Sequence, residues 1–555
     1  MRSFVQTADA VGATTKKLEK LRVLSEYFKC VSIDEAVLAA RFFSAHVFPR
    51  NDERSIGVGG ANLWRVIAEA AGKDGAKLGS AYRKHGDLGD MAQELFSGTH
   101  RDGDLPLAEI AQLFEDLSNA RGPSQKAELL ANAFKRASAG DVKYLVKIIT
   151  GDLRIGSKEN LVEEAIAKAF ERPVAEVRRA NMLSGDIGET LRLAAENRLE
   201  DTVVRLFHPL GFMLAAAVET AEELFEKELA QIDVPALLVE EKYDGIRAQV
   251  HKDGAGKVRI FSRTLDEVTE FPELVPAIRQ LPGEFILDGE ILGWRDDRPL
   301  PFTELQKRLG RKLLDMFIQN DIPVKIVAFD LLYQNGELLL DDTLASRKAR
   351  LDVLGALAPA AVRIAGRAEC SSAHAVRVAF RNALAAGHEG IVVKTADSPY
   401  TPGRRGGFWF KLKEPFATLD VVVTAVEYGH GKRHEVLSDY TFAVREGDQL
   451  LNIGKAYSGL TDAEIREYTD FFMKHTIEDR GHLRVVEPTV VLEVAFNNIQ
   501  KSGRHDSGYA LRFPRIVRIR TDKTVSQIDT LETVAKLFER QTGKPEARAS
   551  HGLSR

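Results

Sequence analysis

Lys242 is the residue whose neighbours most clearly suggest chemistry. An apolar run at 237–239 predicts a buried strand, Tyr243-Asp244-Gly245 predicts a turn, and the alternation over 247–251 predicts a second strand. A lysine held at a strand end and partly desolvated can act as a nucleophile, because only its neutral amine attacks. The same pattern also fits a surface hairpin with ordinary charges, so Lys242 alone decides nothing.

Further segments with chemically useful side chains follow in a fixed order. They are Phe261-Ser262-Arg263, Asp288-Gly289-Glu290, the strand-like run 328–333, Glu389-Gly390 leading to Lys394, the run 409–413, and Arg512-Phe513-Pro514-Arg515. Two of the carboxylates, Glu290 and Glu389, are hard oxygen ligands suited to Mg²⁺ that is bound mainly through substrate phosphates and water, and each has a neighbouring glycine. Without further context, such a pair also fits ordinary solvated carboxylates.

Basic residues near these segments could neutralise a nucleoside triphosphate. The candidates are Arg247, Arg263, Lys394, Arg405, Lys411 and Lys413. Strand alternation over 409–413 predicts that Lys411 and Lys413 lie on one face. The same pattern also fits an amphipathic edge strand, where exposed lysines are common.

Taken together, the order and spacing of these segments resemble the motifs of the covalent nucleotidyltransferases. The closest resemblance is to ATP-dependent DNA ligases of the larger type, which have an N-terminal helical DNA-binding domain, and it extends from about Leu18 to Lys523. The resemblance implies that Lys242 attacks the α-phosphate of ATP to form lysyl-AMP. The AMP would then pass to the 5′-phosphate of a nick in double-stranded DNA, and the 3′-hydroxyl would seal the strand.

The resemblance also implies roles for other side chains. Glu240 would accept a hydrogen bond from the adenine amino group, and Phe329 would stack on the base, although a strand phenylalanine is usually part of a core. In the C-terminal region, Arg512 and Arg515 would orient the leaving pyrophosphate, with Lys523 as a further candidate. ATP and Mg²⁺, with Mn²⁺ as a substitute, are the implied cofactors, and the DNA would be read without sequence preference.

Composition limits the other classes of function. The 555-residue chain is 44% hydrophobic and has a net charge of −4, so a nucleic acid would have to be met by local basic patches. Cys30 and Cys370 provide neither a disulfide framework nor zinc-site spacing, which fits a reducing compartment. The sequence shows no export signal and no apolar run of about 18 residues. These features predict a cytoplasmic location, and the resemblance implies an enzyme that works as a monomer and associates with the nucleoid when on DNA.

Changes in pattern along the chain predict a multidomain architecture. We expect an all-α DNA-binding domain over 1–205, an α+β (ATP-grasp-like) adenylation domain over 206–415, a β-barrel OB-fold domain over 416–540 and a flexible tail over 541–555. A hinge is expected at Lys413–Phe416, because one OB surface would serve two steps of the reaction.

Glycine turns recur in the helical region. His85–Asp90 and Ser184–Glu189 are similar, and each precedes a helix, which suggests a duplicated unit. A third turn over 151–157 places Ser157 as an N-cap candidate. Such turns bind phosphates through backbone N–H groups or simply cap helices, and the sequence leaves both interpretations open.

Periodicity predicts the individual elements. Helices are expected over 17–28, 34–48, 107–117, 161–170 and 462–474, and strands over 257–262, 284–294, 325–333, 390–394, 420–428, 440–445, 450–456, 489–496 and 515–520.

Several alternatives remain at the level of sequence. An RNA ligase or an mRNA-capping guanylyltransferase shares the chemistry, but capping enzymes lack a helical domain of about 200 residues. A catalytically silent nucleic-acid-binding module would be expected to lose Lys242, Glu290 or Glu389, and all three are present. A scaffold role would need a hydrophobic anchor in the tail, which offers only Leu553. Thr264 departs from the amide-bearing residue usual in the family, and the role of Arg347 is left open.

Overall fold

The computed structural model describes residues 1–97, 104–230, 236–309, 321–403, 405–413, 417–429 and 433–542. The chain forms two compact units, Met1–Leu412 and Lys413–Arg555, which are described separately below. Glu414–Phe416 of the predicted hinge and the predicted tail from Gly543 lie outside the described residues.

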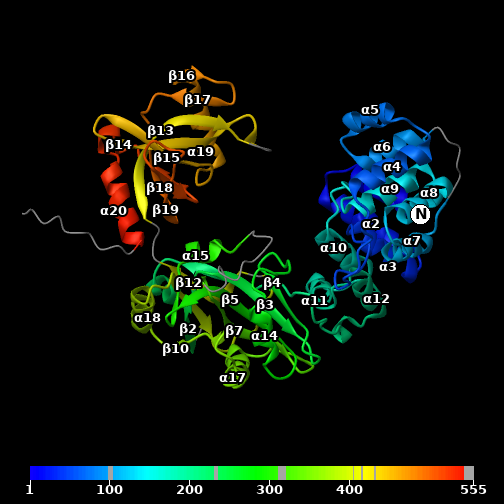
Figure 1. Ribbon diagram of the computed structural model, residues 1–555, viewed down its shortest axis with the longest axis horizontal. Coiled ribbons are helices and arrows are strands. Elements are labelled where there is room, and N and C mark those ends of the chain that lie inside the picture. Colours follow the sequence, from blue (N-terminus) through cyan, green and yellow to red (C-terminus); the bar gives the residue numbers. More distant parts are fainter. Residues whose placement is uncertain are drawn as a thin grey trace, which may run out of the picture. The chain divides into compact units, whose positions relative to one another are not determined.

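The N-terminal part of the first unit is helical, and it appears in blue to cyan in Figure 1. Its helices are α1 (Arg2–Gly12), α2 (Lys17–Cys30), α3 (Ile33–Phe43), α4 (Gly60–Ala71), α5 (Gly75–His85), α6 (Leu88–Phe96), α7 (Leu107–Asn119), α8 (Pro123–Arg136), α9 (Ala139–Thr150), α10 (Glu159–Ala169), α11 (Val174–Ser184) and α12 (Ile187–Glu196), followed by a 3₁₀ turn at Leu199–Asp201. Helix α3 ends earlier than its apolar pattern predicts, and Ala45 just beyond it has a left-handed φ of 59° that a continuing helix cannot contain. None of the helices in the described ranges has the length and apolarity that crossing a membrane requires.

The two repeated glycine turns are helix caps. Gly86 and Gly185 end α5 and α11 in the left-handed conformation, and Asp87 and Asp186 then cap α6 and α12 by accepting backbone N–H groups. Each aspartate also pairs with a basic residue of a neighbouring helix: Lys147 Nζ lies 3.2 Å from Asp87, and Arg41 Nη2 lies 2.7 Å from Asp186. These turns present carboxylates already engaged by cations, which favours the capping interpretation over phosphate binding.

Ser157 is not the N-cap of α10, so that prediction is wrong. Lys158 occupies the cap position, and the Ser157 hydroxyl donates instead to the carbonyl oxygen of Phe43 at 3.2 Å. The Ser157 hydroxyl is therefore used in a long-range contact with the end of α3 and does not cap α10.

Two sheets form the remainder of the first unit within the described ranges (Figure 1). The β2 sheet has the order β1 (Leu214–Val218), β12 (Arg405–Lys413), β11 (Gly390–Thr395), β2 (Leu237–Lys242), β10 (Arg367–Cys370). The β3 sheet has the order β4 (Val258–Ser262), β3 (Ile246–Lys252), β5 (Phe285–Arg295), β7 (Val324–Gln334), β8 (Glu337–Leu338), with β6 (Arg298–Pro299) on β5 and β9 (Val362–Ile364) on β7.

Helices cover these sheets and provide their hydrophobic cores. The helical elements are α13 (Ala221–Glu223), a π-helical turn at Leu224–Glu228, α14 (Leu274–Arg279), α15 (Phe302–Gln306), α17 (Leu344–Gly355) and α18 (Ala373–Ala385). Val376 of α18 is buried in the same cluster as Val393 and Phe410 of the β2 sheet. Leu351 of α17 is buried with Ile326 of the β3 sheet. Each sheet therefore has its own helical cover.

The segment around Lys242 is not a hairpin. Strands β2 and β3 belong to different sheets, and Tyr243–Gly245 carries the chain from one to the other. A Cβ atom on Gly245 would lie 2.4 Å from the carbonyl oxygen of Ile291, so this crossing has room only for glycine. The surface-hairpin interpretation of this segment is therefore wrong, and Lys242 lies at a junction between two sheets.

The C-terminal unit is rich in strands, as predicted. Its main sheet runs β15 (Gln449–Ala456), β14 (Leu437–Glu446), β13 (Thr418–Tyr428), β17 (Leu483–Val486), β16 (Thr476–Asp479), with β18 (Val491–Ala495) joining β13 to β21 (Arg515–Ile519), while β19 (Asn498–Lys501) pairs with β20 (Tyr509–Arg512). The inserted helix α19 has the predicted bounds, Asp462–Lys474. A 3₁₀ turn at Val525–Gln527 and a further helix, α20 (Leu531–Thr542), were not predicted.

Candidate active site

Lys242 and Glu389 are brought together by the pairing of β2 with β11. Lys242 lies opposite Gly390, and the backbone N–H of Glu389 donates to the carbonyl oxygen of Lys242 at 3.2 Å. The Lys242 ammonium forms an ion pair with the Glu389 carboxylate, and the two side chains are 21% and 28% exposed. The lysine is therefore sheltered but still reachable by a substrate.

Glu290 enters from the other sheet. It lies on β5 directly opposite Arg247 of β3, and burial raises the pKa of its carboxyl to about 7, with Lys242 and Arg247 acting in the opposite direction. A carboxyl with this pKa gains from a nearby cation. Among the described residues, no group of three or more His, Cys, Asp or Glu side chains is arranged to hold a metal. Mg²⁺ bound chiefly through substrate phosphates needs only one or two protein carboxylates, and Glu290 and Glu389 have the chemistry for that.

Glu240, two residues before Lys242 on β2, forms a buried ion pair with Lys394. Lys394 Nζ lies 2.7 Å from Glu240 Oε2, and both residues are less than 5% exposed. Burial lowers the pKa of Lys394 to about 8, although Glu240 opposes the shift. The Lys394 ammonium also lies 4.1 Å from the centre of the Trp409 ring and 4.7 Å from that of Phe329.

Arg247 is fixed by contacts on several sides. It donates two hydrogen bonds to Asp288, at 3.1 and 2.7 Å, and Asp288 also accepts from the Tyr400 hydroxyl at 2.7 Å. Its guanidinium carbon lies 5.5 Å from the centre of the half-buried Phe329 ring. Phe329 therefore lies at the boundary of both sheets, beside the Glu240 and Lys394 pair.

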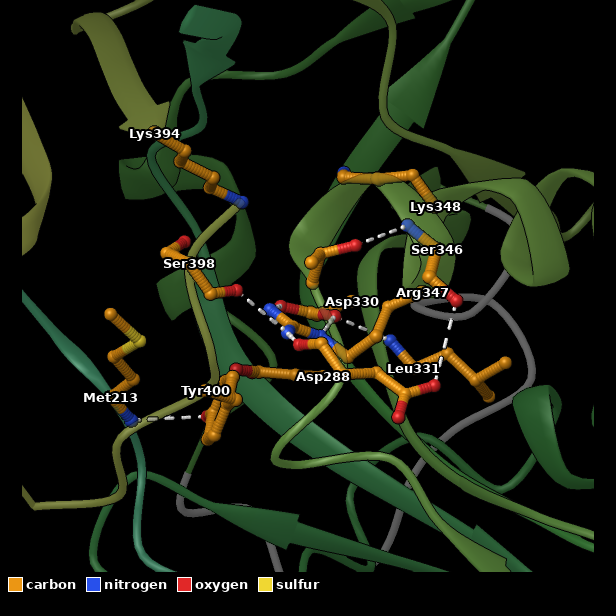
Figure 2. Close-up of polar contacts among 12 residues, drawn as sticks. Met213, Asp288, Asp330, Leu331, Ser346, Arg347, Lys348, Lys394, Ser398 and Tyr400 are labelled. Atoms are coloured by element: carbon orange, nitrogen blue, oxygen red, sulfur yellow. Dashed lines mark hydrogen bonds and ion pairs between the residues drawn. The ribbon is translucent and has the colours of Figure 1, made fainter. Parts of the chain in front are cut away.

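Arg347 and its neighbour Lys348 are buried near this site, and the sequence analysis had left Arg347 without a role. Arg347 donates to both oxygens of Asp330, at 2.8 and 3.0 Å, and to the carbonyl oxygen of Ser398 (Figure 2). It also donates to the carbonyl oxygen of Asp342. The signal in the sequence was a lone aspartate, Asp330, within the apolar run 328–333. Such a residue needs a buried partner, but the sequence does not say which cation supplies it.

The remaining predicted residues up to the end of β12 at Lys413 are more exposed. Phe410 and Leu412 are buried in the core of the β2 sheet, so Lys411 and Lys413 lie on the other face of β12, as the alternation predicts. Arg405 is exposed at the start of β12, and Arg263 is exposed in the turn after β4. All four cations are accessible, or partly accessible, to a polyanion.

The other candidates lie in the C-terminal unit. Arg512 ends β20 with its guanidinium carbon 4.9 Å from the centre of the exposed Phe513 ring, and Arg515 begins β21 as an exposed residue. Lys523 forms an ion pair with Asp420, and Asp420 also pairs with Arg520.

Comparison with known proteins places the N-terminal, middle and C-terminal parts of the chain in the same family. Three family profiles match: "DNA ligase N terminus" over 1–167, "ATP dependent DNA ligase domain" over 212–413 and "ATP dependent DNA ligase C terminal region" over 433–523. A "Probable DNA ligase" of Koribacter versatilis is 48% identical over the whole chain and 99% of its own length. The chain belongs to the ATP-dependent DNA ligases. The sealing of nicks in DNA at the expense of ATP is the activity of this family, and it is the activity of this chain.

More distant members of the ligase family agree with this assignment. The "DNA ligase" of Methanothrix thermoacetophila is 34% identical over 98% of this chain and 98% of its own length. A solved structure described as "Pmar-Lig_PreS3" superposes with a TM-score of 0.53 over 93% of this chain and 99% of that one, at 16% identity, which shows the shared fold.

Proposed function

We propose that this ligase works through a covalent Lys242–AMP intermediate. The observation that most supports this role is the position of Lys242 at the crossing between two sheets, where it pairs with Glu389 and its charge acts to lower the pKa of Glu290. The Lys242 amine, once deprotonated, attacks the α-phosphorus of ATP. A nitrogen–phosphorus bond forms, the bond from the α-phosphorus to the bridging oxygen breaks, and pyrophosphate leaves.

Two further displacements complete the proposed reaction. An oxygen of the 5′-phosphate at the nick attacks the AMP phosphorus, which breaks the nitrogen–phosphorus bond and returns the electron pair to Lys242. The 3′-hydroxyl then attacks the activated 5′-phosphate, forms the phosphodiester, loses its proton to solvent and releases AMP. One difficult condensation is thereby divided into three easier steps.

The other side chains bind and orient the substrate in this proposal. Glu240 accepts a hydrogen bond from the adenine amino group, and Phe329 stacks on the base. The triphosphate is bound by Arg247, Arg263, Lys394, Arg405, Lys411 and Lys413, and the pyrophosphate is oriented by Arg512 and Arg515 with Lys523 as a further contact. Glu290 and Glu389 would hold Mg²⁺ or Mn²⁺, which when bound supplies positive charge that favours the neutral amine and stabilises the phosphates.

A self-adenylation assay tests the proposal. We expect label from α-labelled ATP with Mg²⁺ to remain on the denatured chain, to disappear in Lys242→Ala, and to persist in Lys227→Ala, which changes an exposed lysine of the same unit. Label from GTP would instead indicate capping chemistry. Absence of label from either nucleotide on folded protein would overturn the covalent mechanism and favour a silent binding module.

The remaining parts of the proposal concern partners. We expect sealing of nicked duplex DNA without sequence preference, and not of nicked RNA, by a monomer. A cytoplasmic, nucleoid-associated location belongs to the same proposal, since the substrate would be chromosomal DNA and both cysteines are free thiols. Gel filtration and a comparison of nicked DNA and RNA duplexes test these points.

A further inference from the structure

Two lysines share the Glu240 carboxylate. Lys394 pairs with Oε2 at 2.7 Å, while the ammonium of Lys348 forms an ion pair with Oε1. The exposed fractions are 4% for Glu240 and 1% for each lysine. In a site of such low dielectric, a second cation on one carboxylate is costly, and it needs a reason beyond simple charge balance.

The two lysines come from different parts of the fold. Lys394 belongs to β11, next to β2 in the same sheet, whereas Lys348 belongs to α17. Figure 2 shows their side chains extending toward one another. Helix α17 is already anchored by Arg347, the residue before Lys348, through Asp330 and two backbone carbonyls. Lys348 is therefore not needed to attach the helix.

The ionisation of Glu240 determines what it can recognise. A buried carboxyl tends to keep its proton, and a protonated carboxyl can donate a hydrogen bond as well as accept one. An ionised carboxylate only accepts. At position 6, adenine presents an amino group, which donates, and guanine presents an oxygen, which accepts. Only the ionised form of Glu240 would distinguish these two bases strongly.

We propose that Lys348 is a positioning residue for nucleotide selection, which holds the Glu240 carboxylate from the side opposite Lys394 so that its free lone pairs accept from the adenine amino group. Lys348 reaches Glu240 from helix α17 and acts through that carboxylate. This inference rests on the role proposed above for Glu240, and it adds the residue that makes that role selective.

The test compares two nucleotides that differ only in the group concerned. Self-adenylation rate constants and KM are measured for full-length Lys348→Met with ATP and with purine riboside triphosphate, which lacks the 6-amino group. We expect the rate divided by KM to fall about 10- to 100-fold for ATP, the size expected for a hydrogen bond to a charged group, and to change little for the analogue. The ATP preference, meaning the rate divided by KM for ATP relative to that for the analogue, should therefore fall by about the same factor.

Arg308→Met is the matched control. Arg308 is a fully buried cation of the same unit that pairs with Glu273, away from Glu240. Its removal should lower stability and leave the ATP preference unchanged. In Glu240→Leu, which removes the acceptor, the ATP preference should also fall, and adding Lys348→Met should change it no further, because both changes act on one group. Lys348→Gln provides the same comparison if the methionine variant folds poorly.

Three results would overturn the inference: equal losses for both nucleotides in the Lys348 variants, an unchanged ATP preference in them, or a wild-type enzyme that does not prefer ATP over the analogue. Failure of the covalent mechanism is distinguishable from these, because the wild-type chain would then take no label from any nucleotide.

Discussion

The two sheets of the first unit differ in the residue types that form their buried ion pairs. The β2 sheet and its helix partners place lysines against glutamates, as in the pairs Lys242 with Glu389 and Lys394 with Glu240. The β3 sheet places arginines against aspartates with two hydrogen bonds each, as in Arg247 with Asp288. Tyr400 adds a further donor to Asp288.

This difference separates groups that can exchange protons from groups that cannot. A guanidinium stays charged at any pH relevant to folding and holds a carboxylate in one geometry, whereas a lysine ammonium responds to burial by a shift in its pKa. Lys242 therefore lies on the sheet whose buried pairs contain lysines, and the arginine–aspartate pairs beside it provide a fixed frame. Glu290 of the β3 sheet differs from that frame, because burial raises the pKa of its carboxyl to about 7. The following experiments test this comparison.

The largest effect on stability is expected from removing an arginine that pairs with a buried aspartate. Arg347→Met leaves Asp330 as an unpaired buried charge, since both side chains are fully buried. We expect the free energy of unfolding of the first unit to fall by about 3–5 kcal/mol, measured by urea denaturation. A loss below about 1 kcal/mol, the range for exposed pairs, would contradict the fixed-frame interpretation.

A smaller effect is expected at Glu290, whose pKa is raised to about 7 from an ordinary 4.5. Between these values the folded state holds a proton that the unfolded state has lost, so the stability that this group contributes falls as pH rises from 4.5 to 7. In metal-free protein, Glu290→Gln should therefore be more stable than wild type at pH 8, by about 2–3 kcal/mol, and similar at pH 4.5. Parallel stability curves for the two proteins would contradict this.

Lys394 should produce a dependence of similar size and opposite sign. Its pKa is lowered to about 8 from an ordinary 10.5, so the unfolded state binds more protons between these values and stability rises with pH. Lys394→Met should remove this slope, worth about 2–3 kcal/mol over the window, in denaturation curves at pH 8 and 10.5. Arg247→Met should leave the slope in place, because a guanidinium does not titrate there.

The smallest effect is expected at Arg350, three residues beyond Arg347 on the same helix. It pairs with Glu337 at the surface, where the two side chains are 38% and 63% exposed. Arg350→Met should change the free energy of unfolding by about 0–1 kcal/mol in the same urea experiment. A loss as large as that of Arg347→Met would show that burial does not distinguish the two arginines.

The sequence alone predicted the elements well where the apolar spacing is regular. Helix α19 has the expected bounds, and β5, β7 and β11 differ from their predicted ends by one residue or so. Local patterns succeed there because each element buries one stripe or face of its own side chains. They fail at Ser157, where a distant carbonyl takes the hydroxyl, and at α20, which was missed.

The candidate site was predicted only in part. The order of the motifs determined the family and gave Lys242 as the candidate nucleophile, because residue types and spacing are properties of the chain itself. The sequence did not predict that Lys348 would face Glu240, 108 positions away, or that Asp330 would face Arg347.

What the sequence determined, then, is the set of reactive groups and the strands and helices that contain them. The tertiary structure alone decided that β2 and β3 separate into two sheets, with Lys242 at the crossing. It also decided which carboxylate each buried cation meets. The physical reason is that these pairings depend on close packing and loss of water across distant segments, and no local pattern in the chain records them.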